Sequence, residues 1–257
     1  MKKNKKYILM MLLTIAIVFS FGKIVSADPI SIPDLNLSIG NESSSPKDYV
    51  DNIKLLIILT ILTLLPSIIV MMTCFTRIVV VFSFLKNALG AQQSIPNQIL
   101  TGLAIFLTIF IMKPVYTEIN DKAIKPYLEE SITQEEAIEV GSKPLRDFML
   151  KETRQKDLEL FIETSGMNEE EITKDNISLS VVIPAFAISE LKTAFEIGFL
   201  IFLPFLIIDM VVASILMSMG MFMIPPVMVS LPFKLLLFVM VDGWNLIVKS
   251  LIMGFGG

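Results

Sequence analysis

Six of the charged side chains in the apolar C-terminal third of the chain are candidates for a functional role, because a charge is energetically costly there. They are Glu190, Lys192, Glu196, Asp209, Lys234 and Asp242. A charged residue at the centre of a membrane helix costs about 2.5–3.5 kcal/mol on insertion scales, and such residues normally face other protein or a water-filled path. Two kinds of chemistry fit: polar contacts inside a helix bundle, or a relay for a transported ion. A position at the membrane interface is the alternative for Glu190, Lys192 and Glu196, and it fits Asp209 and Lys234 poorly.

The composition limits which other sites the chain could build. The sequence has 54% hydrophobic and 18% charged residues, no histidine and a single cysteine, Cys74. It therefore lacks the partners for a Ser-His or Cys-His nucleophile, for a disulfide within the chain and for a thiolate or imidazole metal site. A carboxylate or Ser-Lys mechanism remains formally possible, but no catalytic spacing is present. We expect no enzyme activity and no cofactor, and the net charge of −4 gives no indication of a nucleic-acid partner.

The N-terminus has the pattern of a secretory signal peptide. Lysines precede an apolar run from Tyr7 to Phe21, and the small-residue cleavage pattern Val25-Ser26-Ala27 follows shortly after it. A basic start, a short apolar run and a small-residue site together predict that residues 1–27 are removed between Ala27 and Asp28. An uncleaved anchor helix is the alternative. The polar residues 28–52 are then predicted to be an exported flexible tail.

Residues 53–112 are predicted to form a first helical hairpin. Its spans are Ile53–Thr73 and Ile99–Met112, and the second is short, because at ~1.5 Å per residue it reaches only ~21 Å. Arg77 and Lys86 lie between the spans without an acidic neighbour. An excess of basic residues marks the cytoplasmic side of a membrane, so we expect a cytoplasmic-side loop there.

Residues 113–180 are acidic and are predicted to form a small helical domain on the extracytoplasmic side. Thr133 and Glu136 have the spacing of a helix capping box. We expect Gly141 to end that helix and Pro144 to begin the next. The charges of this block are interpreted as a solvated surface.

Prolines divide the C-terminal region, residues 181–257, and Pro225-Pro226 cannot continue a helix. Two helices, roughly 184–222 and 227–252, should therefore form a hairpin. Methionines occupy every second position at its tip: Met217, Met219, Met221 and Met223. Because methionine is flexible and polarizable, these side chains either fill gaps in a core or form an elastic seal around a pore.

These patterns together predict an all-α integral membrane protein. It would have a cleaved signal peptide, about four apolar helical segments with kinked hairpins, and a small helical extracytoplasmic domain.

Long ordered motifs between about residues 50 and 250 resemble the FliP family of type III secretion export-gate proteins. They are Phe75-Thr76-Arg77, Asn87-Ala88-Leu89-Gly90, Pro96-Asn97-Gln98, the run from Pro184 to Phe199, Pro204 to Asp209, Pro225-Pro226, Leu231 to Lys234 and Val241 to Trp244. The resemblance implies a core subunit of the flagellar export gate, which forms the pore through which unfolded flagellar subunits are secreted. It also implies a homo-oligomer, a pentamer in this family, assembled with FliQ- and FliR-like subunits and with FlhA- and FlhB-like export proteins.

The resemblance further implies a location in the cell membrane and the flagellar basal body, and roles for particular residues. The pore gasket would be Met219, Met221, Phe222 and Met223, and the six charged residues would make polar contacts between subunits. The family commonly has three consecutive methionines, and Phe222 replaces the middle one. The equivalent injectisome subunit is an alternative, but the signal segment favours the flagellar branch. An ion-coupled transporter subunit is less favoured, because the two halves show no inverted repeat.

Overall fold

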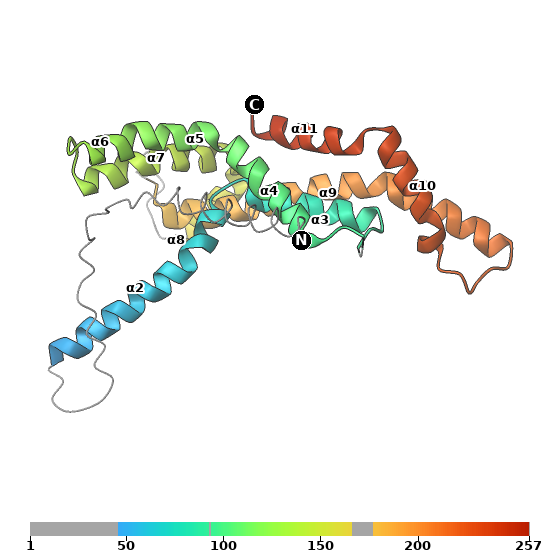
Figure 1. Ribbon diagram of the computed structural model, residues 1–257, viewed down its shortest axis with the longest axis horizontal. Coiled ribbons are helices and arrows are strands. Elements are labelled where there is room, and N and C mark those ends of the chain that lie inside the picture. The colour runs from blue at the N-terminus through green and yellow to red at the C-terminus, as the bar shows by residue number, and fades with distance from the viewer. Residues whose placement is uncertain (1–45, 93, 166–176, 257) are drawn as a thin grey trace, which may run out of the picture. The chain divides into compact units, whose positions relative to one another are not determined.

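The computed structural model describes residues 46–92, 94–165 and 177–256, which form helices and short links without a strand (Figure 1). The predicted signal peptide, its cleavage site at Ala27 and Asp28, and the tail up to residue 45 lie outside these ranges. Helix α2 (Pro46–Met71) begins seven residues before the predicted hairpin, within the predicted tail. The chain divides inside α2 into two units, and the second, Thr60–Gly257, contains helices α3 to α11. The all-α prediction is confirmed for the described residues.

The lengths of the apolar helices are those of a membrane protein. Among the described residues, Ile53–Met71 of α2 and the whole of α9 (Leu179–Ser218) are long and apolar enough to cross a membrane. Two bent pairs, α4 (Asn97–Ile111) with Lys113–Leu128 and α10 (Pro226–Met240) with α11 (Gly243–Phe255), could each form one broken span. The described chain thus offers two to four spans. With 40 residues, α9 is ~60 Å long, about twice the ~30 Å hydrocarbon core of a bilayer.

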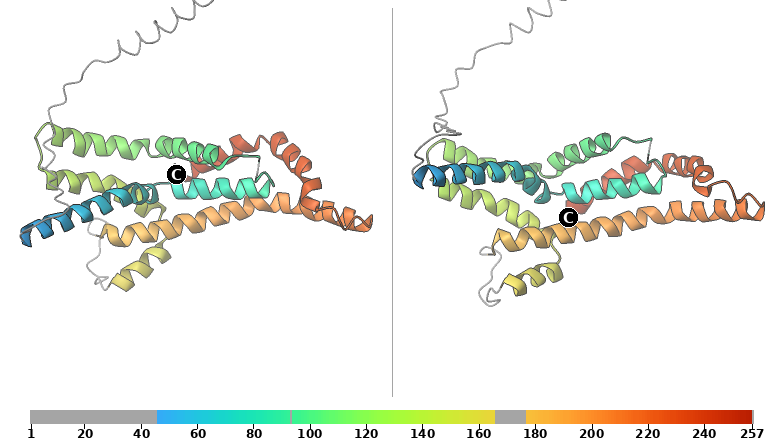
Figure 2. Two further views of the ribbon diagram at one scale, coloured as in Figure 1. Left: turned by 60° about the horizontal axis from the view of Figure 1, so that its bottom comes forward. Right: turned by 90° about the horizontal axis from the view of Figure 1, so that it is seen from below.

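Helices α3 (Phe75–Ala88) and α9 lie side by side, as both views of Figure 2 show, and run in the same direction. Contacts along the pair fix this direction: Arg77 bonds to Glu190 near the start of α3, and the Phe84 ring meets Phe195 edge-on, with centroids 5.3 Å apart. Gly198 faces the same ring so closely that a Cβ there would lie 2.5 Å from ring atoms. The absence of a side chain at this position lets the two helices approach.

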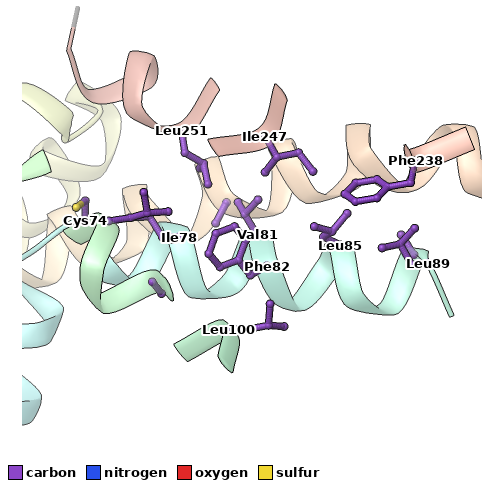
Figure 3. Packing of buried hydrophobic residues seen from close by; sticks show 14 of the residues in the cluster. Cys74, Ile78, Val81, Phe82, Leu85, Leu89, Leu100, Phe238, Ile247 and Leu251 are labelled. Carbon is purple, nitrogen blue, oxygen red and sulfur yellow. The ribbon is translucent and has the colours of Figure 1, made fainter. Parts of the chain in front are cut away.

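Helices α10 and α11 return along the α3–α9 pair and complete its core. Ile247 and Leu251 of α11 point toward α3 in Figure 3 and belong to the same buried cluster as Val81 and Phe82. The Trp244 ring meets the Phe82 ring edge-on, with centroids 6.4 Å apart. The core therefore centres on α3, whose buried residues share one apolar cluster with residues of α4, α9, α10 and α11.

A sharp break separates α10 from α11, where the sequence predicted one continuous helix to residue 252. Asp242 adopts a left-handed conformation with φ 49°, and the two helices are bent by 60°. Gly243 follows, and a Cβ there would lie 2.2 Å from the ring of Phe238. Aspartate followed by glycine is a common turn signal, so this break was recognisable in the sequence.

The acidic region folds into α5 (Lys113–Ile119), a π-helical turn η1 (Asn120–Ile124), α6 (Lys125–Leu128), α7 (Gln134–Glu152) and α8 (Gln155–Ser165). The capping box is confirmed: the Glu136 amide donates to Thr133 Oγ1 (3.3 Å), and the Thr133 amide donates to Glu136 Oε2 (2.9 Å). The expected helix end at Gly141 and new start at Pro144 are wrong, because α7 continues through both. Pro144 is buried, so packing overrides the local cost of an interior proline.

Two glycine substitutions should separate close helix packing from helix propensity. Gly198→Ala places a methyl group against Phe84, so we expect it to lower the free energy of unfolding by about 1–3 kcal/mol. Gly102→Ala is the control, since it also lies inside a helix but meets nothing within 4 Å. It should raise the free energy of unfolding by up to ~1 kcal/mol. Thermal unfolding of the purified protein in detergent measures both, and equal effects would contradict the packing described.

Candidate functional site

The first of two buried charge clusters, the Arg77 cluster, consists of Arg77, Glu152 and Glu190 and joins helices α3, α7 and α9. The Nη2 group of Arg77 donates to Glu152 Oε2 (2.9 Å) and to Glu190 Oε1. Arg77 is 5% exposed and Glu190 is fully buried. One cation therefore holds two carboxylates from helices that are distant in sequence, at the place where the acidic region meets the apolar bundle.

The Phe255 ring closes the Arg77 cluster from α11. The guanidinium carbon of Arg77 lies 3.8 Å from the ring centroid, which is the geometry of a cation–π contact. Arg77 Nε and Glu190 Oε2 have no hydrogen-bond partner among the residues that the structure describes. Removing one member of a buried ion pair leaves an uncompensated charge and is strongly destabilising. The cluster therefore fixes the relative positions of four helices. The intact cluster adds little net stability, but removing one of its members costs much.

Ser189, the neighbour of Glu190 on α9, connects α9 to α8. Ser189 Oγ donates to Asp157 Oδ2 (2.6 Å) and accepts from the Arg154 amide (3.1 Å). The Arg154 guanidinium donates through Nε and Nη2 to the same Asp157 oxygen, at 2.9 and 2.6 Å. Adjacent residues of α9 thus hold both the end of α7 and the start of α8.

The second cluster, the Lys234 cluster, consists of Asp209, Ser230 and Lys234 and joins α9 to α10. Lys234 Nζ donates to Asp209 Oδ2 (2.6 Å), and Ser230 Oγ donates to Asp209 Oδ1 (2.5 Å). Lys234 also donates to the backbone carbonyl oxygen of Ala88, the last residue of α3 (3.1 Å). Lys234 is 2% exposed, so this charge is removed from solvent and compensated inside the chain.

The six charged residues singled out in the sequence thus fall into two groups. Glu190, Asp209 and Lys234 are paired inside the chain. Lys192 and Glu196 form an exposed pair on α9, with N···O 3.8 Å and side chains 54% and 65% exposed. Asp242 is exposed at the α10–α11 break. Contacts of these residues between subunits stay a prediction.

Sequence reasoning missed three members of the clusters, namely Arg77, Glu152 and Ser230. Arg77 was assigned to a cytoplasmic-side loop, yet residues 75–88 form a helix in which its side chain is buried. The prediction of a cytoplasmic-side loop rested on two cations, Arg77 and Lys86, and the burial of Arg77 leaves only Lys86 to support it. Lys86 donates to Asn97 Oδ1 (2.7 Å). The signal for burial was present: Arg77 is followed by an almost continuous apolar run.

The loop between α9 and α10 displays the predicted gasket residues on the outside of the described chain. Phe222 and Met223 are 78% and 96% exposed, and Met219 and Met221 are also exposed. The loop begins with a Schellman motif: Gly220, with φ 79°, donates to the Met217 carbonyl (3.0 Å), and the Met221 amide donates to the Leu216 carbonyl (2.9 Å). The helix end is therefore well defined, and the apolar side chains beyond it project outward.

These features define an all-helical protein of the integral-membrane type, with membrane-length helices and internally paired charges. The model of the FliP family matches residues 58–251. The chain belongs to this family.

Several relatives carry the description "Flagellar biosynthetic protein FliP". The protein of Bacillus subtilis (strain 168) is 57% identical over 213 residues, which cover 83% of this chain and 96% of that protein. The protein of Aquifex aeolicus is 51% identical over 222 residues, covering 86% of this chain and 91% of that protein. The protein of Caulobacter vibrioides is 48% identical over 221 residues, covering 86% and 82%.

Breaking the Arg77 cluster should be far more costly than breaking the exposed pair on α9. Arg77→Met leaves Glu152 and Glu190 without their cation, and we expect it to lower the free energy of unfolding by about 3–5 kcal/mol. Lys192→Met is the matched control, because its pair is exposed, and it should cost less than ~1 kcal/mol. Thermal unfolding in detergent compares the two variants. A loss for Arg77→Met as small as that for Lys192→Met would contradict the structural role of the cluster.

The α8–α9 connection should make stability depend on pH through Asp157. Burial alone would raise the pKa of Asp157, but hydrogen bonds from Ser189 and then from Arg154 outweigh it and hold the pKa below the usual value, which is about 3.9. A carboxyl whose pKa is lowered in the folded state stabilises that state above the usual value, and this contribution is lost as the pH falls through the lowered pKa. In thermal unfolding from neutral to acid pH, Asp157→Asn should show a shallower loss of stability than the unchanged protein. Identical profiles would show that Asp157 does not contribute.

Proposed function

We propose that this protein is a core subunit of the flagellar type III protein export gate, and that its α9–α10 hairpin lines and closes the pore for unfolded flagellar subunits. Membership of the FliP family and the names of the relatives support the flagellar assignment. The observation that carries the pore assignment is the exposed apolar loop at the end of the hairpin, with Met221, Phe222 and Met223 projecting from a defined helix end.

Exposed side chains of this kind and size need a partner. Fully burying a methionine or phenylalanine side chain contributes ~1.5–3 kcal/mol relative to leaving it in water. A ring of copies arranged around one axis would bring the loops together, so that each loop buries its apolar side chains against the others. Methionine adapts its shape to its surroundings, which suits a seal that must open for a chain of varied side chains. Phe222 adds bulk and is stiffer.

The outer face of α9 supports assembly with other subunits. Phe195, Phe199 and Leu200 are exposed there, next to the exposed pair of Lys192 and Glu196. Lipid tails could cover the apolar side chains but would leave the charges unsolvated. Neighbouring subunits satisfy both, and the length of α9, ~60 Å, takes it beyond the bilayer core into such an assembly. The polar contacts between subunits are assigned first to Lys192, Glu196 and Asp242.

The assembly is a homo-oligomer, a pentamer by its resemblance to the family, joined by FliQ- and FliR-like subunits and served by FlhA- and FlhB-like export proteins. The export gate lies in the cell membrane within the flagellar basal body. The signal peptide, residues 1–27, and the extracytoplasmic placement of residues 113–180 are part of this proposal. The same fold would serve an injectisome gate, which differs in its cargo.

Loss of the bulky loop side chains should leave the resting gate open to ions. The change Met221→Ala, Phe222→Ala and Met223→Ala removes most apolar volume at the tip, so cells with the assembled gate should lose membrane potential in the absence of export. A potential-sensitive dye measures this. The control is Phe106→Ala with Phe110→Ala, which removes exposed apolar side chains from α4 instead and should leave the potential unchanged. An intact potential in the loop variant would place the seal elsewhere.

A further inference from the structure

The α9–α10 hairpin extends beyond the other helices of its unit, and the Lys234 cluster lies where it leaves them. Helix α3 ends at Ala88, whereas α9 continues past Asp209 to Ser218 and α10 returns from Pro226. Residues 210–226, called the arm below, therefore project past the end of α3 (Figure 1). The gasket loop lies at the end of this arm.

Most of the arm has little packing of its own among the described residues. Exposed apolar side chains follow the part of α9 that belongs to it: Met210, Val211, Ile215 and Met217. Few buried contacts mean low local stability, so the position of such a segment depends on its attachment at the base. That attachment is the Lys234 cluster and the adjoining contact with the end of α3.

Lys234 donates to a free carbonyl group at the C-terminal end of α3 in addition to its ion pair with Asp209. The last four carbonyl groups of a helix have no partner within it. Leu85, Lys86 and Asn87 find partners in the amides of residues 89–91 at 3.0–3.2 Å, while the carbonyl of Ala88 accepts from Lys234 Nζ at 3.1 Å. A cation suits the negative end of the helix dipole, and a carboxylate at the same place would be repelled.

The chain turns just after the end of α3, where it meets α10. Gly90 has φ 69°, and a Cβ there would lie 3.5 Å from Leu231 and 3.7 Å from Val227. Apolar packing thus surrounds the bond between Lys234 and Ala88. The bond is shielded from water and connects α10 to α3. The ion pair between Lys234 and Asp209, by contrast, connects the two helices of the hairpin to each other.

We propose that Lys234 is a positioning residue that fixes the direction of the arm relative to α3 through its bond to the Ala88 carbonyl, and so sets where the gasket loop lies. The consequence for gating rests on the proposed function, but the position of the arm does not. Opening the pore would then require the arm to turn about the Lys234 cluster or the neighbouring copies to separate.

Three substitutions separate the bond to α3 from the ion pair. Lys234→Met keeps the length of the side chain but loses both interactions. The exchange Asp209→Lys with Lys234→Asp keeps an ion pair between α9 and α10 but puts an acceptor where the Ala88 carbonyl needs a donor. Lys234→Arg keeps a cation and donors for both. If only the ion pair matters, the exchange behaves like the unchanged protein; if the bond to α3 matters, it behaves like Lys234→Met.

The test is a distance measurement between spin labels on the full chain in detergent, with Cys74→Ala as the background. One label pair, Ser83→Cys with Met223→Cys, joins α3 to the gasket loop at two exposed positions. A second pair, Ser83→Cys with Glu159→Cys, joins α3 to α8 and reports on the core alone. Pulsed electron paramagnetic resonance gives the distance distribution for each pair.

The proposal predicts a single narrow α3–loop distance in the unchanged protein and in Lys234→Arg, and loss of that narrow distance in Lys234→Met and in the exchange. The core distance should stay narrow in all four. A narrow α3–loop distance in the exchange would overturn the proposal in favour of the ion pair. Broadening of both distances together would also overturn it, because Lys234 would then hold the core and not the arm. None of these outcomes depends on whether the loop seals a pore, which the membrane-potential experiment tests separately.

Discussion

The buried guanidinium of Arg77 is the interaction on which the rest of the fold depends. It donates to two carboxylates, from α7 and α9, and lies over the ring of Phe255 from α11. Apolar surfaces alone select a helix arrangement weakly when the surroundings are also apolar, as they are in a membrane. A buried charge that must find its partner is more selective, because every alternative packing leaves it uncompensated. The Arg77 cluster thereby joins the acidic helical region to the apolar bundle at one place.

The Lys234 cluster is a second buried charge pair, and it lies at the C-terminal end of α3, where it also involves α9. Arg77 lies near the start of α3 and pairs with Glu190, while the carbonyl at the end of α3 binds Lys234, which pairs with Asp209. Helix α3 is therefore held to α9 and α10 by charges at both ends and by apolar packing between them. Beyond the second cluster the hairpin continues without α3, and its loop presents the most exposed apolar side chains. A firmly held base and a free apolar tip suit a gate.

How far the sequence predicts this structure differs between its features. Hydrophobic runs predicted the helices, and the capping box at Thr133 and the turn at Pro225-Pro226 were located correctly. The continuation of α7 through Gly141 and Pro144 was not predictable locally, since burial of Pro144 decides it. The costly charges Glu190, Asp209 and Lys234 were recognised, but not their partners, because 113 residues separate Arg77 from Glu190 and 25 separate Asp209 from Lys234. Pairing of that kind depends on tertiary packing, which one sequence does not encode in any local pattern.

A cryo-electron microscopy structure of the assembled membrane complex tests the central claim most directly. The account predicts that the α9–α10 loops of all copies converge on one axis, with Met221, Phe222 and Met223 at the narrowest point. Within each copy, Arg77 should pair with Glu190 and Lys234 with Asp209. Loops that point outward into lipid, away from any common axis, would contradict the account.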